Sequence, residues 1–293
     1  MIKSAFIILV LTAILITGCQ KESKVSPTKG HLTVEVDPSV YPVIVKEKAA
    51  FDSLYKEVKV NLKEVDPMQG MVNVINGNSK VFISPRYFNK KEIDFINKEK
   101  INIQTFKFCY LACAVIAPLN SPTDKIRVDE IKDALMGNLK NYSFVIPQSN
   151  TATYQYIQEE ILDGSSPKDA EIVPTDNDVL KKISEGGNKL GILSFNTVQD
   201  SSKIKFLQVG QIEKKITKPE KNGLDVNYFT PHPGFLIKKY YPLSQTVYIY
   251  LHELLLTPAS GFTTFLTSYE GQKIALRENL APAAVPVRIN ESQ

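Results

Sequence analysis

The sequence predicts an α/β fold in which strands and helices alternate along the chain. Between residues 31 and 117, runs of β-forming residues are separated by runs with apolar residues at helical spacing, in the order βαβαβαβ. The same alternation continues between residues 128 and 195. An apolar content of 43% and a charged content of 23% are ordinary for a globular protein, so these elements are expected to enclose a buried core.

The first third of the chain supplies the clearest elements. Strands are predicted at residues 31–36, 58–65, 80–84, 101–105 and 107–117, where β-branched and aromatic residues are frequent. Helices are predicted between them at residues 43–55, 68–75 and 90–98. The long apolar run at 107–117 is expected to be a central strand of the sheet.

The remaining elements follow the same reasoning. Helices are predicted at residues 128–136, 152–162 and 177–184, and strands at 143–146, 171–173 and 190–195. Gly137 is expected to end the first of these helices as its C-terminal cap. Residues 203–222 are predicted to form a strand and an exposed basic loop, and helices are predicted at 248–256, 260–268 and 271–277.

The N-terminus has the features of a lipoprotein signal peptide, predicted to span residues 1–18. Lys3 precedes an apolar run at residues 5–16, which is too short for a spanning helix of roughly 20 residues. The run closes with Ile-Thr-Gly-Cys, which resembles the lipobox whose cysteine, here Cys19, is acylated. An ordinary signal peptide or an uncleaved N-terminal helix are the alternatives. The polar residues 19–29 are predicted to be a flexible tether.

The charge distribution narrows the classes of partner. About 260 residues remain after the tether, enough for one large domain or two lobes. The formal net charge is +4, and the lysines are interleaved with acids, so nucleic-acid binding is not expected. No second apolar run approaches membrane length, which predicts a soluble body.

Metal sites, cofactors and catalysis are not expected either. On a strand, Cys109 and Cys113 would share one face at roughly 13 Å, beyond the ~7 Å that a disulfide allows, and they are interpreted as core residues. His31, His232 and His252 lack zinc-site spacing. The sequence contains no GxSxG, P-loop or HExxH motif, so an enzymatic function is not predicted.

Several segments in one order resemble a known family. They are VEVDPSVYPVI, VFISPRYFNKKEIDFI, CAVIAPLNSPTDKIRVDEIKDALMG, VIPQSNTATYQYI, GGNKLGILSFN, YYPLSQTVYIYL and GFTTFLTSYEGQKIALRENLAP. This series is similar to the PstS-like phosphate-binding proteins of ABC importers, particularly their lipoprotein members. The resemblance extends from about Gly30 to Pro282.

The resemblance implies a periplasmic-binding-protein fold of type 2. Each of two lobes would be a mixed sheet flanked by helices, with the ligand in the cleft between them. Lobe 1 would comprise residues 30–117 and 202–293, and lobe 2 would comprise residues 118–201. The chain would then cross between the lobes near Ala117 and near Ser201.

The candidate ligand-binding residues lie in three turns that follow predicted strands. An anion pocket needs helix N-termini, hydroxyl donors and sometimes an arginine. The candidates are Ser39, Ser84, Arg86, Ser149, Asn150 and Thr151.

Four of these candidates, and Tyr41 beside them, also have a purely structural alternative. Ser149 or Asn150 could serve only as a helix N-cap, and Ser39 only as a turn residue. Arg86 could pair with a surface acid, and Tyr41 could only pack. These alternatives remain open from the sequence.

The candidate site departs from the family pattern. The family commonly has an arginine shortly before Ser-Gly-Thr, whereas residues 147–151 read Pro-Gln-Ser-Asn-Thr. The glycine- and serine-rich loop after the first strand is replaced by Asp-Pro-Ser-Val at residues 37–40. The site therefore has less positive charge and less room for close backbone approach.

The resemblance nevertheless implies a function. The expected protein is a monomeric substrate-binding lipoprotein of the cell envelope, anchored to a membrane through Cys19. It would capture phosphate or a similar oxyanion and deliver it to an ABC-transporter permease. A sensor or partner-binding lipoprotein that keeps the fold without a small ligand is the alternative.

Overall fold

The computed structural model describes residues 25–211, 228–252 and 256–284. The predicted signal peptide and Cys19, together with most of the predicted basic loop, lie outside the described residues. Within the described ranges, no helix is both long enough and apolar enough to span a membrane.

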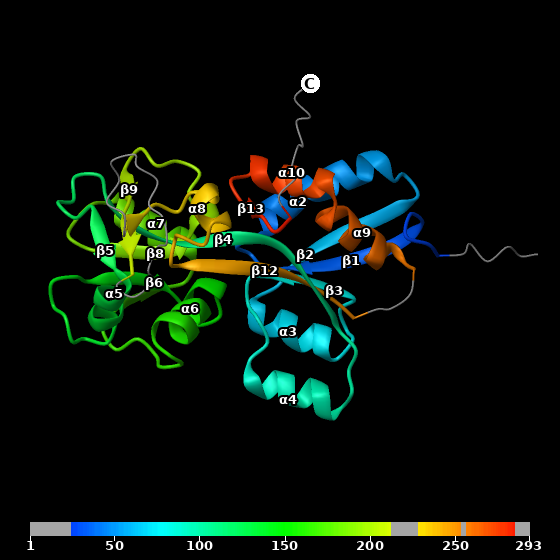
Figure 1. Cartoon of the computed structure of the whole chain (residues 1–293), viewed down its shortest axis with the longest axis horizontal. Coiled ribbons are helices and arrows are strands. Elements are labelled where there is room, and N and C mark those ends of the chain that lie inside the picture. The colour runs from blue at the N-terminus through cyan, green and yellow to red at the C-terminus, as the bar shows by residue number, and fades with distance from the viewer. Residues whose placement is uncertain (1–24, 212–227, 253–255, 285–293) are drawn as a thin grey trace, which may run out of the picture.

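A single long strand joins the two halves of the molecule. β4 (Gln104–Pro118) pairs along its first part with β12 (Ser244–Leu251) and along its last part with β8 (Leu190–Ser194). Figure 1 shows β4 and β12 running side by side between two lobes. The fold is therefore the mixed α/β, two-lobed arrangement that the resemblance implies.

Lobe 1 is a mixed sheet covered by helices on both faces. Its strand order is β2 (Val58–Glu64), β1 (Gly30–Val36), β3 (Val81–Ser84), β12 and β4, with β13 (Ala281–Pro282) also on β4. One face carries α2 (Tyr41–Leu54), α9 (Pro258–Thr267) and α10 (Tyr269–Arg277). The opposite face carries α3 (Pro67–Ile75), beyond which lies α4 (Lys90–Lys98), none of whose residues is buried (Figure 1).

Lobe 2 contains a second sheet and a small three-stranded one. The second sheet is formed by the end of β4 with β8, β6 (Phe144–Pro147), β7 (Glu171–Val173) and β9 (Ile204–Phe206). The small sheet consists of β5 (Lys125–Arg127), β10 (Gln208–Gly210) and β11 (Tyr228–Phe229). The helical elements are α5 (Val128–Leu135), α6 (Ala152–Tyr156), the π turn η1 (Ile157–Ile161), α7 (Asp176–Ser184), the 3-10 turn η2 (Phe195–Thr197) and α8 (Pro233–Ile237).

Three element predictions need correction. The two strands predicted at 101–105 and 107–117 are one strand, β4. The helix predicted at 248–256 is wrong where the structure describes it, because Tyr248–Leu251 belong to β12, between β3 and β4. The helix predicted at 152–162 is α6 followed by the π turn η1. Gly137 does follow α5 with a φ of 79°, as expected of a glycine C-terminal cap.

The second crossing between the lobes lies at β12 and not near Ser201. Leu207, Leu236 and Tyr241, which the resemblance assigns to lobe 1, are buried in one cluster with Phe144 of lobe 2. The Tyr241 hydroxyl also donates to the Cys113 carbonyl at 3.0 Å. Residues up to about 243 therefore belong to lobe 2.

Two further expectations concern small segments. Residues 26–29, predicted to lie in the tether, form a turn closed by Ser26 and Lys29, and the Pro27 carbonyl lies against Gly261 of α9. Cys109 and Cys113 are free and buried, which agrees with their interpretation as core residues.

Candidate ligand-binding cleft

Two cavities open between the lobes. The smaller, about 340 Å³, is named here the Asp37 cleft. The larger, about 540 Å³, is named the Tyr87 cavity, and Ala152 at the start of α6 lines both. Both volumes fall in the range of ligand pockets, ~300–1,000 Å³.

The Asp37 cleft lies where parallel strands end. Its lobe-1 wall comes from the segments that follow β1 and β2, and its lobe-2 wall from those that follow β6 and β7. Ligands commonly bind at the carboxyl ends of strands in open α/β sheets. Its polar lining side chains are Asp37, Ser39, Tyr41, Glu64, Asp66, Gln148, Asn150, Thr151, Thr175, Asp176, Asn177 and Thr197.

Asp37 is buried and organises the lobe-1 wall. Its Oδ1 accepts hydrogen bonds from the Ser39 backbone N–H at 2.9 Å and the Ser39 hydroxyl at 2.6 Å. Its Oδ2 accepts from the Ser84 hydroxyl at 2.9 Å. Burial raises the pKa of Asp37 from 3.8 to about 6, although these hydrogen bonds act in the opposite direction. Both predicted serines thus direct their hydroxyl protons to Asp37.

Asp176 adds a second carboxylate at the N-terminus of α7. It accepts from the Thr153 hydroxyl and from the Ser194 backbone N–H, both at 2.7 Å. Burial raises the pKa of Asp176, and its negative charge contributes to the raised pKa of Asp37. The charge of Asp176 therefore disfavours ionisation of Asp37.

The lining of the Asp37 cleft is acidic. Glu64 and Asp66 join Asp37 and Asp176, and the lining residues that the structure describes include no lysine or arginine. Asp66 is occupied as the N-cap of α3, where it accepts from the backbone N–H groups of Met68 and Gln69. No group of His, Cys, Asp or Glu among the residues that the structure describes could hold a metal ion.

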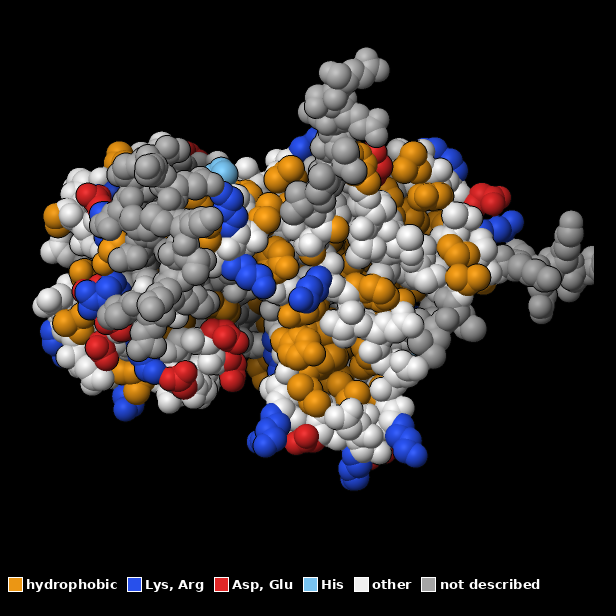
Figure 2. All heavy atoms as spheres, viewed as in Figure 1, with side chains coloured by type: hydrophobic (Ala, Val, Ile, Leu, Met, Phe, Trp, Pro, Cys, Tyr) orange, Lys and Arg blue, Asp and Glu red, His pale blue; other side chains and the backbone are white. Residues whose placement is uncertain are grey.

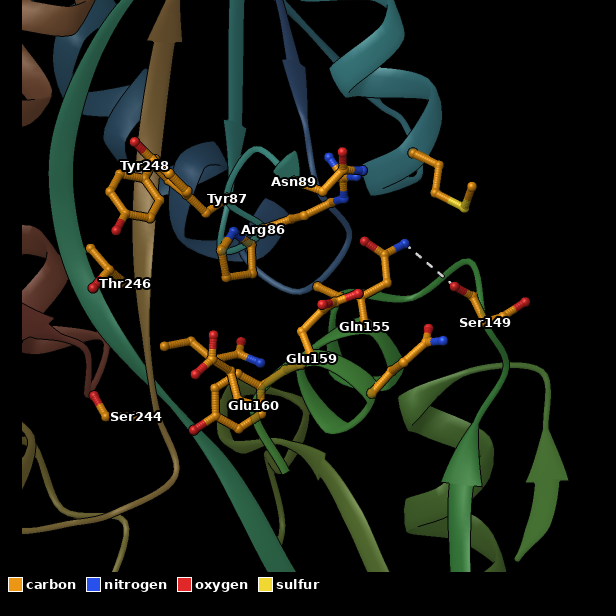
Figure 3. Close-up of a pocket in the computed structure, with 16 residues that line it drawn as sticks. Arg86, Tyr87, Asn89, Ser149, Gln155, Glu159, Glu160, Ser244, Thr246 and Tyr248 are labelled. Atoms are coloured by element: carbon orange, nitrogen blue, oxygen red, sulfur yellow. Dashed lines mark hydrogen bonds between the residues drawn. The ribbon is translucent and has the colours of Figure 1, made fainter. Parts of the chain in front are cut away.

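Residues of the lobe-2 turn that precedes α6 line both cavities. Thr151 caps the helix by accepting from the Tyr154 N–H at 3.2 Å, so the N-cap is neither Ser149 nor Asn150. Asn150 and Thr151 line the Asp37 cleft, whereas Ser149 lines the Tyr87 cavity. Figure 3 shows Ser149 accepting a hydrogen bond through its carbonyl from the Gln155 side chain, at 3.3 Å.

Arg86 lines the Tyr87 cavity but is already paired. Its two terminal nitrogens donate to the two carboxylate oxygens of Glu92 at 2.9 and 2.8 Å. Glu92 is itself fixed because it forms a capping box with Asn89 at the start of α4. The alternative that Arg86 pairs with an acid is therefore confirmed, and its charge is neutralised locally.

The structure brings together only part of the predicted set. Ser39, Asn150 and Thr151 line one cleft, Ser84 lies behind it, and Arg86 and Ser149 line the other cavity. The sequence reasoning missed Asp37 and Asp176 as lining residues. Their position in the sequence could have identified them, because each stands at or near the carboxyl end of a strand and ahead of a helix.

A match to a family model shows which protein superfamily includes this chain. Residues 21–270 match the family model of the PBP superfamily domain. The chain belongs to the PBP superfamily. The phosphate-binding protein PstS of Staphylococcus epidermidis is 22% identical to this PBP superfamily member over 284 residues, which cover 90% of this chain and 82% of that protein.

Solved structures agree with this membership at the level of the fold. A protein assigned as a phosphate ABC transporter substrate-binding protein, with bound phosphate, from Clostridium perfringens is 20% identical and superimposes with a TM-score of 0.70, covering 87% of this chain and 100% of that one. An ABC-type phosphate transport receptor from Vibrio cholerae is 15% identical with a TM-score of 0.66, covering 85% and 98%. The chain therefore shares the fold of these two binding proteins.

Proposed function

We propose that this PBP superfamily member is a monomeric extracytoplasmic substrate-binding protein, anchored through Cys19, that captures phosphate or a similar oxyanion for an ABC-transporter permease. The relatives named above are phosphate-binding proteins, which supports this ligand class. The Asp37 cleft is the proposed binding site because residues of both lobes line it.

One observation carries the proposal. The 14-residue helix α2 begins at the Asp37 cleft, and no side chain caps its N-terminus. The positive end of the helix dipole favours an anion there. Asn150 and Thr151 line the same space from lobe 2, so the two lobes can close on one small ligand.

The acidic lining predicts a pH-dependent affinity. Above pH 6 the ionised Asp37 repels an anion, and protonation below pH 6 removes this charge. The raised pKa of Asp176 acts in the same direction. Oxyanion affinity should therefore rise several-fold as the pH falls from 7.5 to 5.0.

Calorimetric titration of the full chain in detergent tests this proposal. Phosphate and sulfate should each bind one-to-one at low salt, and more tightly at pH 5.0 than at pH 7.5. Sulfate keeps its charge over this range, so its pH dependence reports on the protein alone. Asn150→Ala should weaken binding of both anions, whereas Ser149→Ala, one residue earlier in the same turn, should not. Absence of heat from both anions at both pH values would contradict the proposal.

A second candidate function is a sensor or partner-binding lipoprotein without a small ligand. It is favoured by the pairing of Arg86 with Glu92 and by the absence of lysine and arginine among the described residues that line the Asp37 cleft. Calorimetric titrations in which neither phosphate nor sulfate produces heat would favour this second function.

A further inference from the structure

The Tyr87 cavity is a second space between the lobes whose chemistry differs from that of an anion site. Its lobe-1 wall is formed by the loop after β3 and by β12, and its lobe-2 wall by α6 and the π turn η1. Figure 3 shows Arg86, Tyr87 and Tyr248 on the first wall and the glutamates of η1 on the second. π turns are rare and occur frequently at functional sites.

The lobe-2 wall presents unpaired acceptors. Glu159 and Glu160 are exposed, and neither forms an ion pair or hydrogen bond with another residue in the described part of the chain. Figure 2 shows acidic side chains along the edge of lobe 2 that faces the lower part of lobe 1.

The lobe-1 wall presents aromatic rings. Tyr87 is 52% exposed, and its ring centroid lies 5.0 Å from that of Tyr248. The faces of such rings attract cations. Arg86 does not offset this preference, because Glu92 neutralises it.

We propose that the Tyr87 cavity binds a small organic cation, an amine or guanidinium compound. Its N–H groups would donate to the carboxylates of Glu159 and Glu160, while Tyr87 and Tyr248 contact its positive charge or its methylene groups. The cavity of about 540 Å³ accommodates a molecule of this kind. This site is separate from the Asp37 cleft, and cation binding here does not require an oxyanion in that cleft.

Calorimetric titration of the full chain in detergent with spermidine and with agmatine tests the proposal. At least one of the two should bind saturably and one-to-one at low salt. The double variant Glu159→Gln/Glu160→Gln should lower the affinity on the order of tenfold. Tyr87→Leu should lower it several-fold, and both substitutions are at exposed positions, so the melting temperature should be unchanged.

A matched variant separates a built site from general charge attraction. Glu185→Gln/Glu270→Gln removes two exposed carboxylates that line neither cavity, and it should leave the affinity unchanged. Equal losses in both double variants, or no saturable binding of either probe, would overturn the proposal. Phosphate affinity should not fall in Glu159→Gln/Glu160→Gln, so failure of this site is distinguishable from failure of the Asp37 cleft.

Discussion

Hydrogen-bond direction at Asp37 limits what the predicted serines can offer a ligand. Because the Ser39 hydroxyl donates to Asp37, it presents lone pairs and not a proton to the cleft while Asp37 is ionised. Ser84 donates to the same carboxylate but lies behind the cleft, where its oxygen accepts from the Arg86 N–H. The Ser39 lone pairs suit an oxyanion that still carries a proton. Protonation of Asp37 frees the Ser39 hydroxyl to donate to a ligand, which adds to the expected gain in affinity at low pH.

Arg86 shows how far a residue's role was predictable. The Asn-x-x-Glu spacing of Asn89 and Glu92 is a helix-start signal visible in the sequence. Its consequence for Arg86 was not visible, because a contact between residues 86 and 92 depends on how the chain turns into α4. The sequence therefore made Arg86 a candidate binding residue and left its pairing open.

A buried glutamate in lobe 1 makes stability depend on pH. Glu47 of α2 has 0% exposure, both of its carboxylate oxygens lack partners in the described structure, and burial raises its pKa from 4.5 to about 9. The folded state holds this proton where the unfolded state has lost it, so stability should fall as the pH rises from about 4.5 to about 9. Between pH 5 and pH 8 the loss would be roughly 4 kcal/mol.

Glu47→Gln removes this titration and should flatten the fall in unfolding free energy between pH 5 and pH 8. Urea denaturation at the two pH values measures it. Glu57→Gln, a substitution at an exposed position just after α2, is the control and should keep the wild-type slope. A Glu47→Gln slope equal to that of the wild type would show that Glu47 does not carry the effect.

At the scale of elements, the errors occur where tertiary pairing decides the conformation. The apolar run that begins at Tyr248 suits a buried helix or a buried strand, because periodicity does not distinguish them. Pairing with β3 on one side and β4 on the other selects the strand. By contrast, α4 was predicted with its exact bounds, because its capping box and its amphipathic pattern are local.

The contact between α9 and the N-terminal turn gives a prediction at this scale. A Cβ on Gly261 would lie 2.1 Å from the Pro27 carbonyl oxygen, so Gly261→Ala must displace the turn at residues 26–29. The expected destabilisation is roughly 1–3 kcal/mol, measured by urea denaturation. Thr264→Ala, an exposed substitution on the same helix, should change stability by less than about 0.5 kcal/mol. Unchanged stability of Gly261→Ala would show that the turn does not pack there.

At the scale of the whole molecule, sequence reasoning predicted two lobes but not where the chain crosses the second time. Alternation along the chain shows how many layers exist, not which lobe a strand joins. Residues 204–210 extend the sheets of lobe 2 by pairing with β4 and β5, contacts that no local pattern encodes. For the same reason, the sequence could not show that Ser149 and Asn150, which are adjacent in one turn, line different cavities.

The sharing of β4 predicts one unfolding transition for the whole body. Phe108 and Leu111 lie in the core of lobe 1, while Cys113 and Val115 of the same strand lie in the cores of lobe 2. Loss of either core should expose the strand and destabilise the other. Scanning calorimetry should show one peak with calorimetric and van't Hoff enthalpies nearly equal. Two resolved peaks would show that the lobes unfold independently.

The two connecting strands also restrict how the lobes can move. They cross at the same level, because the Cys113 N–H donates to the Leu243 carbonyl at 2.9 Å. Two connections that cross at one level allow the lobes to bend about a single axis and resist sliding of one lobe past the other. Hinge bending is therefore the easiest motion between the lobes. A ligand in either cavity would shift the equilibrium of this hinge bending. Each of the two ligands would then alter the affinity for the other by the same factor. The two cavities therefore share one hinge motion between the lobes.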